Sequence, residues 1–326
     1  DIISLSQWFL KLTLPVYIFA FLRVFIQNKD DLKGILTTFL YACGTAYLIL
    51  LYELIFNPIR QEYSRGLERL QGGYADVMNY AIYLSFGFLI LTYFFISYRI
   101  TRQGLKIDIP ALIISGTITV AGFLAISHTV SFIVFAALII ILITSIARKL
   151  KYVSLVIIFV LIILLALFGK DIFNERIDPL VEKEVEVVQG ERAESQMFHG
   201  RMYRWQYAWK NFQDVSLISW LLGYSISLES PFFNISIGIH NDYLRIFYFT
   251  GIIGAICYLL FLFRIWRRKR AVLLPERYLL YGTMAILILY SFTTTPTFYV
   301  NFLYVLFAIF SYFSLPLPIF SRNGKN

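Results

Sequence analysis

Long blocks of apolar residues are the feature that most limits what this 326-residue chain can fold into. A helix needs about 20 residues to cross the hydrocarbon core of a bilayer. Nine blocks approach or exceed that length: 7–26, 33–56, 77–98, 108–126, 129–147, 151–169, 240–264, 277–294 and 297–317. Only 15% of the residues are charged, against about 25% in soluble domains. The predicted fold class is therefore an all-α, polytopic membrane helix bundle of nine spans.

The basic residues are concentrated in connections that lie on one side of this predicted bundle. More than half of the 29 Lys and Arg residues lie in alternate connections, at 27–33, 97–106, 147–151, 264–277 and 321–326. Cytoplasmic connections carry an excess of Lys and Arg, so we expect these connections and the C-terminus on the cytoplasmic side. The same rule explains the net charge of +9 without a nucleic-acid partner. Nine spans then place Asp1 outside, and we expect an odd number of further spans before it.

The chain divides into three predicted parts: membrane spans in 1–169, a long external loop in 170–239, and membrane spans in 240–326. The loop begins with a highly charged stretch, ERIDPLVEKEVEVVQGERAES, which we expect to be exposed. Aromatic residues then recur at helical spacing in RMYRWQYAWKNFQDVSLISWLL. That pattern predicts an amphipathic helix at the membrane surface, in contact with membrane lipids.

Two arginines open this amphipathic stretch. Arg201 and Arg204 are one helical turn apart, so both side chains can face one side of the helix. Guanidinium groups bind phosphate in a bidentate manner, and a helix N-terminus favours anions. The pair therefore indicates a phosphate-binding site, with contacts to lipid headgroups as the equally favoured alternative.

A second polar cluster opens the apolar run at 240–264. His240 comes first, followed by Asn241, Asp242 and Arg245. Asp242 and Arg245 are spaced to pair on one helix face, which lowers the cost of placing each in a membrane. Histidine is the side chain best suited to accept a proton near neutral pH. The simpler interpretation of His240 alone is a residue at the membrane interface.

Metal and cofactor chemistry has little support in the sequence. The three histidines are far apart, and the two cysteines, Cys43 and Cys257, lie inside apolar runs. We therefore predict no protein-bound metal and no cofactor. A Mg²⁺ ion carried by a pyrophosphate substrate stays an alternative.

Three stretches carry motif patterns. The first is RLQGGYADVMNYAIYL, and the second is GRMYRWQYAWKNFQDVSLISWLLGYS. The third is HNDYLRIFYFTGIIG. In this order they resemble the O-antigen ligase/polymerase family, membrane glycosyltransferases of the GT-C class. The matching residues are Arg69, Gly72, Asn79, Arg201, Trp205, Gly223, His240, Asn241, Asp242, Tyr243, Leu244, Thr250, Gly251 and Gly254.

The resemblance implies transfer of a glycan from an undecaprenyl-diphosphate carrier, at the outer face of a bacterial cytoplasmic (inner) membrane. A ligase gives the glycan to a lipid A core acceptor, and a polymerase gives it to another carrier-linked repeat unit. We favour the ligase-like activity, with the repeat-unit polymerase as the alternative. Carried over residue by residue, His240 activates the acceptor hydroxyl and three arginines bind the diphosphate: Arg69, Arg201 and Arg204. Supporting roles fall to Asn241, Asp242, Arg245 and His128.

This chain departs from the family pattern at two positions. The tight turn that often reads Ser-Arg in the family reads Ser127-His128-Thr129 here, so either His128 or Arg69 takes over a diphosphate contact. Phe249 stands where the family usually has an acidic residue. A lipid or solute transporter is the alternative of another class, but transporters place polar groups near mid-membrane and often show two related halves. The polar clusters of this chain lie at one predicted face, which favours an enzyme.

Overall fold

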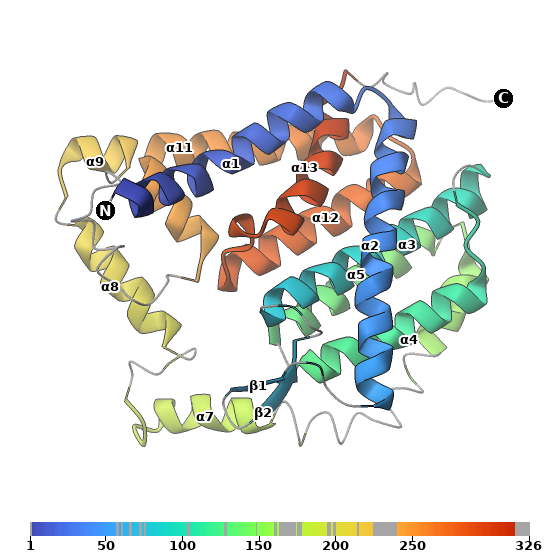
Figure 1. Ribbon diagram of the computed structural model, residues 1–326, viewed down its shortest axis with the longest axis horizontal. Helices are drawn as coiled ribbons and strands as arrows, with labels where there is room; N and C mark the ends of the chain where they lie inside the picture. The colour runs from blue at the N-terminus through green and yellow to red at the C-terminus, as the bar shows by residue number, and fades with distance from the viewer. Residues whose placement is uncertain are drawn as a thin grey trace. The chain divides into compact units, whose positions relative to one another are not determined.

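The computed structural model describes residues 2–56, 59, 61–64, 67–71, 74, 76–102, 105–126, 129–147, 149–159, 162, 174, 178–193, 197, 200–213, 215–223 and 240–316. Most of these residues are helical (Figure 1). They belong to two compact units. Unit 1 comprises Asp1–Val16, Ile162–Arg264 and Ser291–Phe298, and unit 2 comprises Tyr17–Leu161, Ile265–Tyr290 and Tyr299–Asn326.

Every predicted apolar block contains a helix. These helices are α1 (Ile2–Phe25), α2 (Lys29–Ile55), α3 (Val77–Thr101), α4 (Ile109–Ile126), α5 (Thr129–Ile146), residues 151–159, α11 (Asp242–Arg267), α12 (Leu274–Thr293) and α13 (Val300–Ser314). Within the described residues, three helices are long and apolar enough to cross a membrane: α2, α3 and α11 with its 3-10 extension Arg268–Arg270. The mainly helical fold is thus confirmed, three helices are candidate membrane spans, and the count of nine crossings stays a prediction.

The predicted external loop contributes three described helices: α7 (Asp178–Val188), α8 (Arg201–Gln213) and α9 (Leu217–Leu222). The single amphipathic helix predicted over 201–222 is in fact two helices. Ser216 begins the second, because its Oγ accepts a hydrogen bond from the Ser219 N–H at 3.2 Å. A serine at this position satisfies an N–H group that the first helical turn leaves without a partner.

A small β-hairpin is an element that the all-α prediction did not include. Strands β1 (Gln61–Ser64) and β2 (Leu67–Leu70) pair antiparallel, with Ser64 opposite Leu67. Two residues, Arg65 and Gly66, separate the strands in the sequence. A short connection containing glycine between two extended runs is the local sequence signal of a hairpin.

Helix α3 is the centre of unit 2. It packs against α2, α4, α5 and α13, and most of its residues are buried. Small residues let the neighbours approach closely: a Cβ on Gly282 of α12 would lie 2.2 Å from Leu89, and one on Gly122 of α4 would lie 2.7 Å from Leu84. Membrane helices associate through such close packing because lipid supplies no hydrophobic drive between them.

Buried hydroxyl groups also join the helices of unit 2. Tyr290 of α12 bonds Ser85 of α3 at 2.8 Å, and Tyr278 bonds Thr92 at 2.6 Å. Tyr80 of α3 donates to the Ala46 carbonyl of α2 at 3.1 Å. Each bond pairs polar groups that would otherwise be unsatisfied in an apolar interior.

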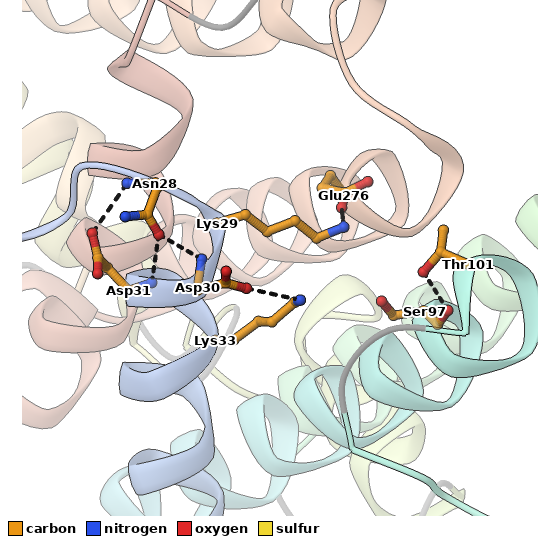
Figure 2. A network of polar contacts seen from close by, with 8 residues as sticks. All are labelled: Asn28, Lys29, Asp30, Asp31, Lys33, Ser97, Thr101 and Glu276. Atoms are coloured by element: carbon orange, nitrogen blue, oxygen red, sulfur yellow. Dashed lines mark hydrogen bonds and ion pairs between the residues drawn. The ribbon is translucent and has the colours of Figure 1, made fainter.

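Polar contacts also join the helices of unit 2 near their ends, and the alternation of the connections between two sides stays a prediction. At one end Lys29 of α2 forms an ion pair with the buried Glu276 of α12 (Figure 2). In the same view, Asn28 caps α2 by accepting from the backbone N–H groups of residues 30 and 31. Both stretches were predicted to be cytoplasmic. Elsewhere in unit 2, the Tyr299 hydroxyl donates to Asp76, the cap of α3, at 2.6 Å.

Candidate functional site

The start of α11, in unit 1, is held by Asn241. Its side-chain oxygen accepts from the Leu244 N–H at 3.0 Å, so Asn241 caps the helix. Its side-chain N–H₂ donates to the Phe292 carbonyl oxygen, also at 3.0 Å. One buried side chain therefore both starts α11 and ties it to the segment Ser291–Phe298.

A buried charged cluster lies directly after this cap. Arg245 Nε donates to Asp242 Oδ1 at 2.8 Å, which confirms the pairing predicted from their spacing. Thr297 completes the cluster: its hydroxyl donates to Asp242 Oδ1 at 3.0 Å, and its backbone N–H donates to Oδ2 at 3.2 Å. Arg245 Nη2 in turn donates to the Thr297 hydroxyl.

These contacts decide what Asp242 can do. Its side chain is 0% exposed, and both carboxylate oxygens accept hydrogen bonds from the protein. A carboxylate in this state is held in one position and is not open to solvent or substrate. Asp242 therefore acts through the structure that it fixes, because a buried charge is stable only when it is paired and hydrogen-bonded.

His240 lies immediately before the capped helix and is exposed. Its backbone φ is +48°, in the left-handed region. Such a conformation costs a non-glycine residue roughly 1–2 kcal/mol, and it persists where the surroundings determine it. The surroundings here are Asn241 and Asp242, each anchored to Ser291–Phe298. The result is an imidazole at the surface beside a rigid, buried anchor.

The two predicted phosphate-binding arginines lie at the N-terminus of α8, also in unit 1. Arg201 is the first residue of the helix, and Arg204 follows one turn later. Both are partly buried. Desolvation lowers the pKa of the Arg204 guanidinium from its ordinary value, but a guanidinium stays protonated near neutral pH. The position thus combines two fixed positive charges with a helix N-terminus, which suits an anionic ligand.

Aromatic contacts hold α8 against the end of α12 and against α11. The Trp205 ring meets the Phe292 ring edge-on, with centroids 5.8 Å apart. At the other end of α8, the buried Phe212 packs against Phe247 and Tyr248 of α11, at 4.9 and 5.6 Å. Phe292 is therefore shared: its ring contacts the arginine helix, and its carbonyl oxygen binds the cap next to His240.

A break in α11 accommodates the end of α9. Gly251 has φ +63° and ψ −167°, which are not helical values, and Figure 1 shows the bend in the α11 ribbon. A Cβ at Gly251 would lie 2.4 Å from the Leu221 carbonyl oxygen, and one at Gly223 would lie 2.2 Å from the Phe249 carbonyl oxygen. Two glycines of the family-like motifs thus meet backbone to backbone. Only glycine combines these angles with such a close approach.

Phe249, the departure from the family pattern, packs in this region. It is 8% exposed and belongs to the aromatic cluster of Phe212 and Tyr248. An acidic side chain there would be buried among rings, so the phenylalanine matches its surroundings.

Arg69 and His128 are the remaining residues of the predicted site. Arg69 lies on β2 in unit 2 and is 8% exposed. His128 and Gly72 lie outside the residues that the structure describes. Both cysteines are free, Cys43 buried and Cys257 exposed.

Across the described ranges, no cluster of three or more His, Cys, Asp or Glu residues could hold an ion.

Two residues of the site were missed by sequence analysis. Thr297 and Phe292 flank a hydroxyl-rich stretch, Thr293–Thr295, which precedes Pro296 and by its sequence alone is typical of a turn. Thr297 could have been noticed as a polar residue beside a proline in a short connection. The neighbouring sequence, however, does not identify its partner on another helix.

Comparison with known proteins adds one match. Residues 110–259 match the family model described as O-Antigen ligase. The matched region contains α8, the capped start of α11 and the break at Gly251. No curated protein matches the chain.

Proposed function

We propose that this protein transfers a glycan from an undecaprenyl-diphosphate carrier to a sugar hydroxyl, because residues 110–259 match the O-antigen ligase family model. The acceptor is a lipid A core sugar in the ligase reaction that we favour. Transfer takes place at the outer face of the cytoplasmic membrane.

One observation carries the proposal. The helix with Arg201 and Arg204 and the helix start beside His240 belong to the same unit and share Phe292 as a contact. A glycosyl transfer from a diphosphate carrier needs these two kinds of group within one site. Cations stabilise the leaving group, and a base activates the acceptor.

The chemistry assigns a role to each side chain. The bond between the anomeric carbon and the diphosphate oxygen breaks, and negative charge develops on the diphosphate. Arg201 and Arg204 stabilise that charge from the N-terminus of α8. His240 accepts the proton of the acceptor hydroxyl as its oxygen bonds to the anomeric carbon, a contribution of typically about 10²–10⁴ in rate.

The test is glycan transfer by the purified protein in lipid nanodiscs, supplied with a labelled carrier-diphosphate glycan. The variants are Arg201→Ala, Arg204→Ala and His240→Ala. Lys210→Ala is the matched control, because it removes an exposed cation from the other end of α8. We expect transfer by the wild type and the control and a loss of at least about 100-fold in the His240 variant. Equal rates for His240→Ala and Lys210→Ala would contradict the assignment.

The acceptor separates the candidate activities. Lipid A core as the only acceptor yields product if the chain is a ligase, and carrier-linked repeat units yield longer chains if it is a polymerase. Unmodified carrier lipid moved across the bilayer, with no new glycosidic bond, would refute both and support a transporter.

A further inference from the structure

Thr297 lies outside the matched family region and outside the three motif-like stretches. It belongs to the 3-10 turn Pro296–Phe298, which follows α12. Its side chain nevertheless reaches the start of α11 and is 7% exposed.

The Thr297 hydroxyl does two things at once. It donates to Asp242 Oδ1 at 3.0 Å and accepts from Arg245 Nη2. A hydroxyl is both a donor and an acceptor, a capacity that valine of the same shape lacks and serine retains. All three residues are buried, so water does not replace a lost partner at little cost.

The Thr297 hydroxyl binds Asp242, and the backbone links Asp242 to His240. Asp242 is two residues after His240, and the intervening Asn241 is bound to the Phe292 carbonyl oxygen. Residues 241 and 242 are thus fixed at two points of the segment Ser291–Phe298. With both following residues fixed, the backbone of His240 is kept in its left-handed conformation, which sets the direction of its Cα–Cβ bond.

We propose that Thr297 is a positioning residue for His240, acting through the Asp242–Arg245 pair. The inference rests on the proposed function, in which His240 accepts the proton of the acceptor hydroxyl. A misplaced base slows the chemical step and leaves binding of the carrier diphosphate at Arg201 and Arg204 unchanged.

The first measurement is steady-state glycan transfer by Thr297→Val and Thr297→Ser in nanodiscs. A displacement of about 1 Å can cost about 100-fold in rate, so we expect kcat of the valine variant to fall about 10- to 100-fold. Its KM for the carrier-linked donor should change less than about threefold, and serine should restore kcat to within about threefold of the wild type. Thr283→Val is the control: it removes a buried hydroxyl that bonds only within α12, to Leu279 at 2.8 Å.

The second measurement does not depend on activity. The chain has three histidines, so NMR of protein with ¹³C,¹⁵N-labelled histidine identifies the His240 imidazole by its loss in His240→Gln. We expect its resonances to shift or broaden in Thr297→Val and to be unchanged in Thr297→Ser and Thr283→Val.

The outcomes separate the two hypotheses. If the wild type transfers no glycan, the proposed function fails, and the NMR comparison alone decides on positioning. Unchanged kcat and unchanged His240 resonances in Thr297→Val overturn the inference, as does equal loss of kcat in the valine and serine variants. If Thr297→Val does not fold, Thr297→Cys replaces it, with kcat expected between the serine variant and complete loss because a thiol is a weaker donor and acceptor.

Discussion

Alanine at position 251 tests whether the break in α11 is required for the docking of α9. Gly251 combines φ +63° with ψ −167°, and an added Cβ would lie 2.4 Å from the Leu221 carbonyl oxygen and 2.5 Å from the Gly223 amide nitrogen. Both neighbours are backbone atoms, so no side chain can rotate away to make room. Gly251→Ala must therefore either strain α11 or separate α9 from it.

The size of the effect follows from two contributions. Holding alanine at such backbone angles costs about 1–3 kcal/mol. Overpacking a close contact costs about 1–3 kcal/mol more, so the free energy of unfolding should fall by about 2–6 kcal/mol. Gly44→Ala is the matched control, because a Cβ on Gly44 of α2 meets nothing within 4 Å. There alanine should stabilise the helix by about 0.5–1 kcal/mol.

The assay is unfolding of the purified protein in detergent micelles by titration with SDS, followed by tryptophan fluorescence. Trp220 of α9 lies in the affected contact, with its ring 5.8 Å from that of Phe247. We expect a lower midpoint for Gly251→Ala and a midpoint at or above the wild type for Gly44→Ala. Superimposable curves for the two variants would refute the reasoning.

Three further predictions concern contacts within the two units. Tyr290→Phe removes a buried hydrogen bond between α12 and α3, so the free energy of unfolding from SDS titration should fall by about 1–2 kcal/mol. The control Tyr304→Phe, at an exposed position, should lower it by less than about 0.5 kcal/mol. Equal losses would argue against the bond. Arg245→Met removes the cation bonded to Asp242 and should lower the free energy of unfolding by about 3–5 kcal/mol. In a double-mutant cycle, adding Asp242→Leu should recover part of that loss. Additive effects of the two substitutions would count against coupling between the two side chains. Trp205→Ala removes the ring contact between α8 and Phe292 and should slow glycan transfer by up to about 100-fold. Trp205→Phe should retain most of the rate. Similar rates for both variants would show that an aromatic ring at position 205 is not needed.

The helices of the apolar blocks were predictable because the length and hydropathy of a block depend only on the residues within it. Each of the nine apolar blocks located in this way contains a helix. The predicted boundary between the blocks 108–126 and 129–147 agrees with the end of α4 at Ile126 and the start of α5 at Thr129. The pairing of Asp242 with Arg245 was predictable for the same reason, since both lie on one helix and their spacing fixes their distance.

The break at Gly251 could not be predicted in the same way. Single glycines are tolerated inside apolar helices, and here the deviation depends on the backbone of α9, which approaches from elsewhere in the chain. The partners Thr297 and Phe292 were missed because their contacts join residues about 50 positions apart, at sequence separations of 55 and 51. A local pattern contains no information about such pairs.

The contact between Thr297 and Asp242 has a consequence for how homologues of this chain can vary. A hydroxyl that serves a buried carboxylate and its arginine is replaceable in evolution only by the other hydroxyl of similar size, or together with the charges that it binds. Among relatives we therefore expect serine or threonine after the proline wherever the aspartate and arginine are kept, and a joint change of all three where they are not. The ion pair and the turn that binds it are thus expected to change together, although only the pair lies within residues 110–259, which match the family model.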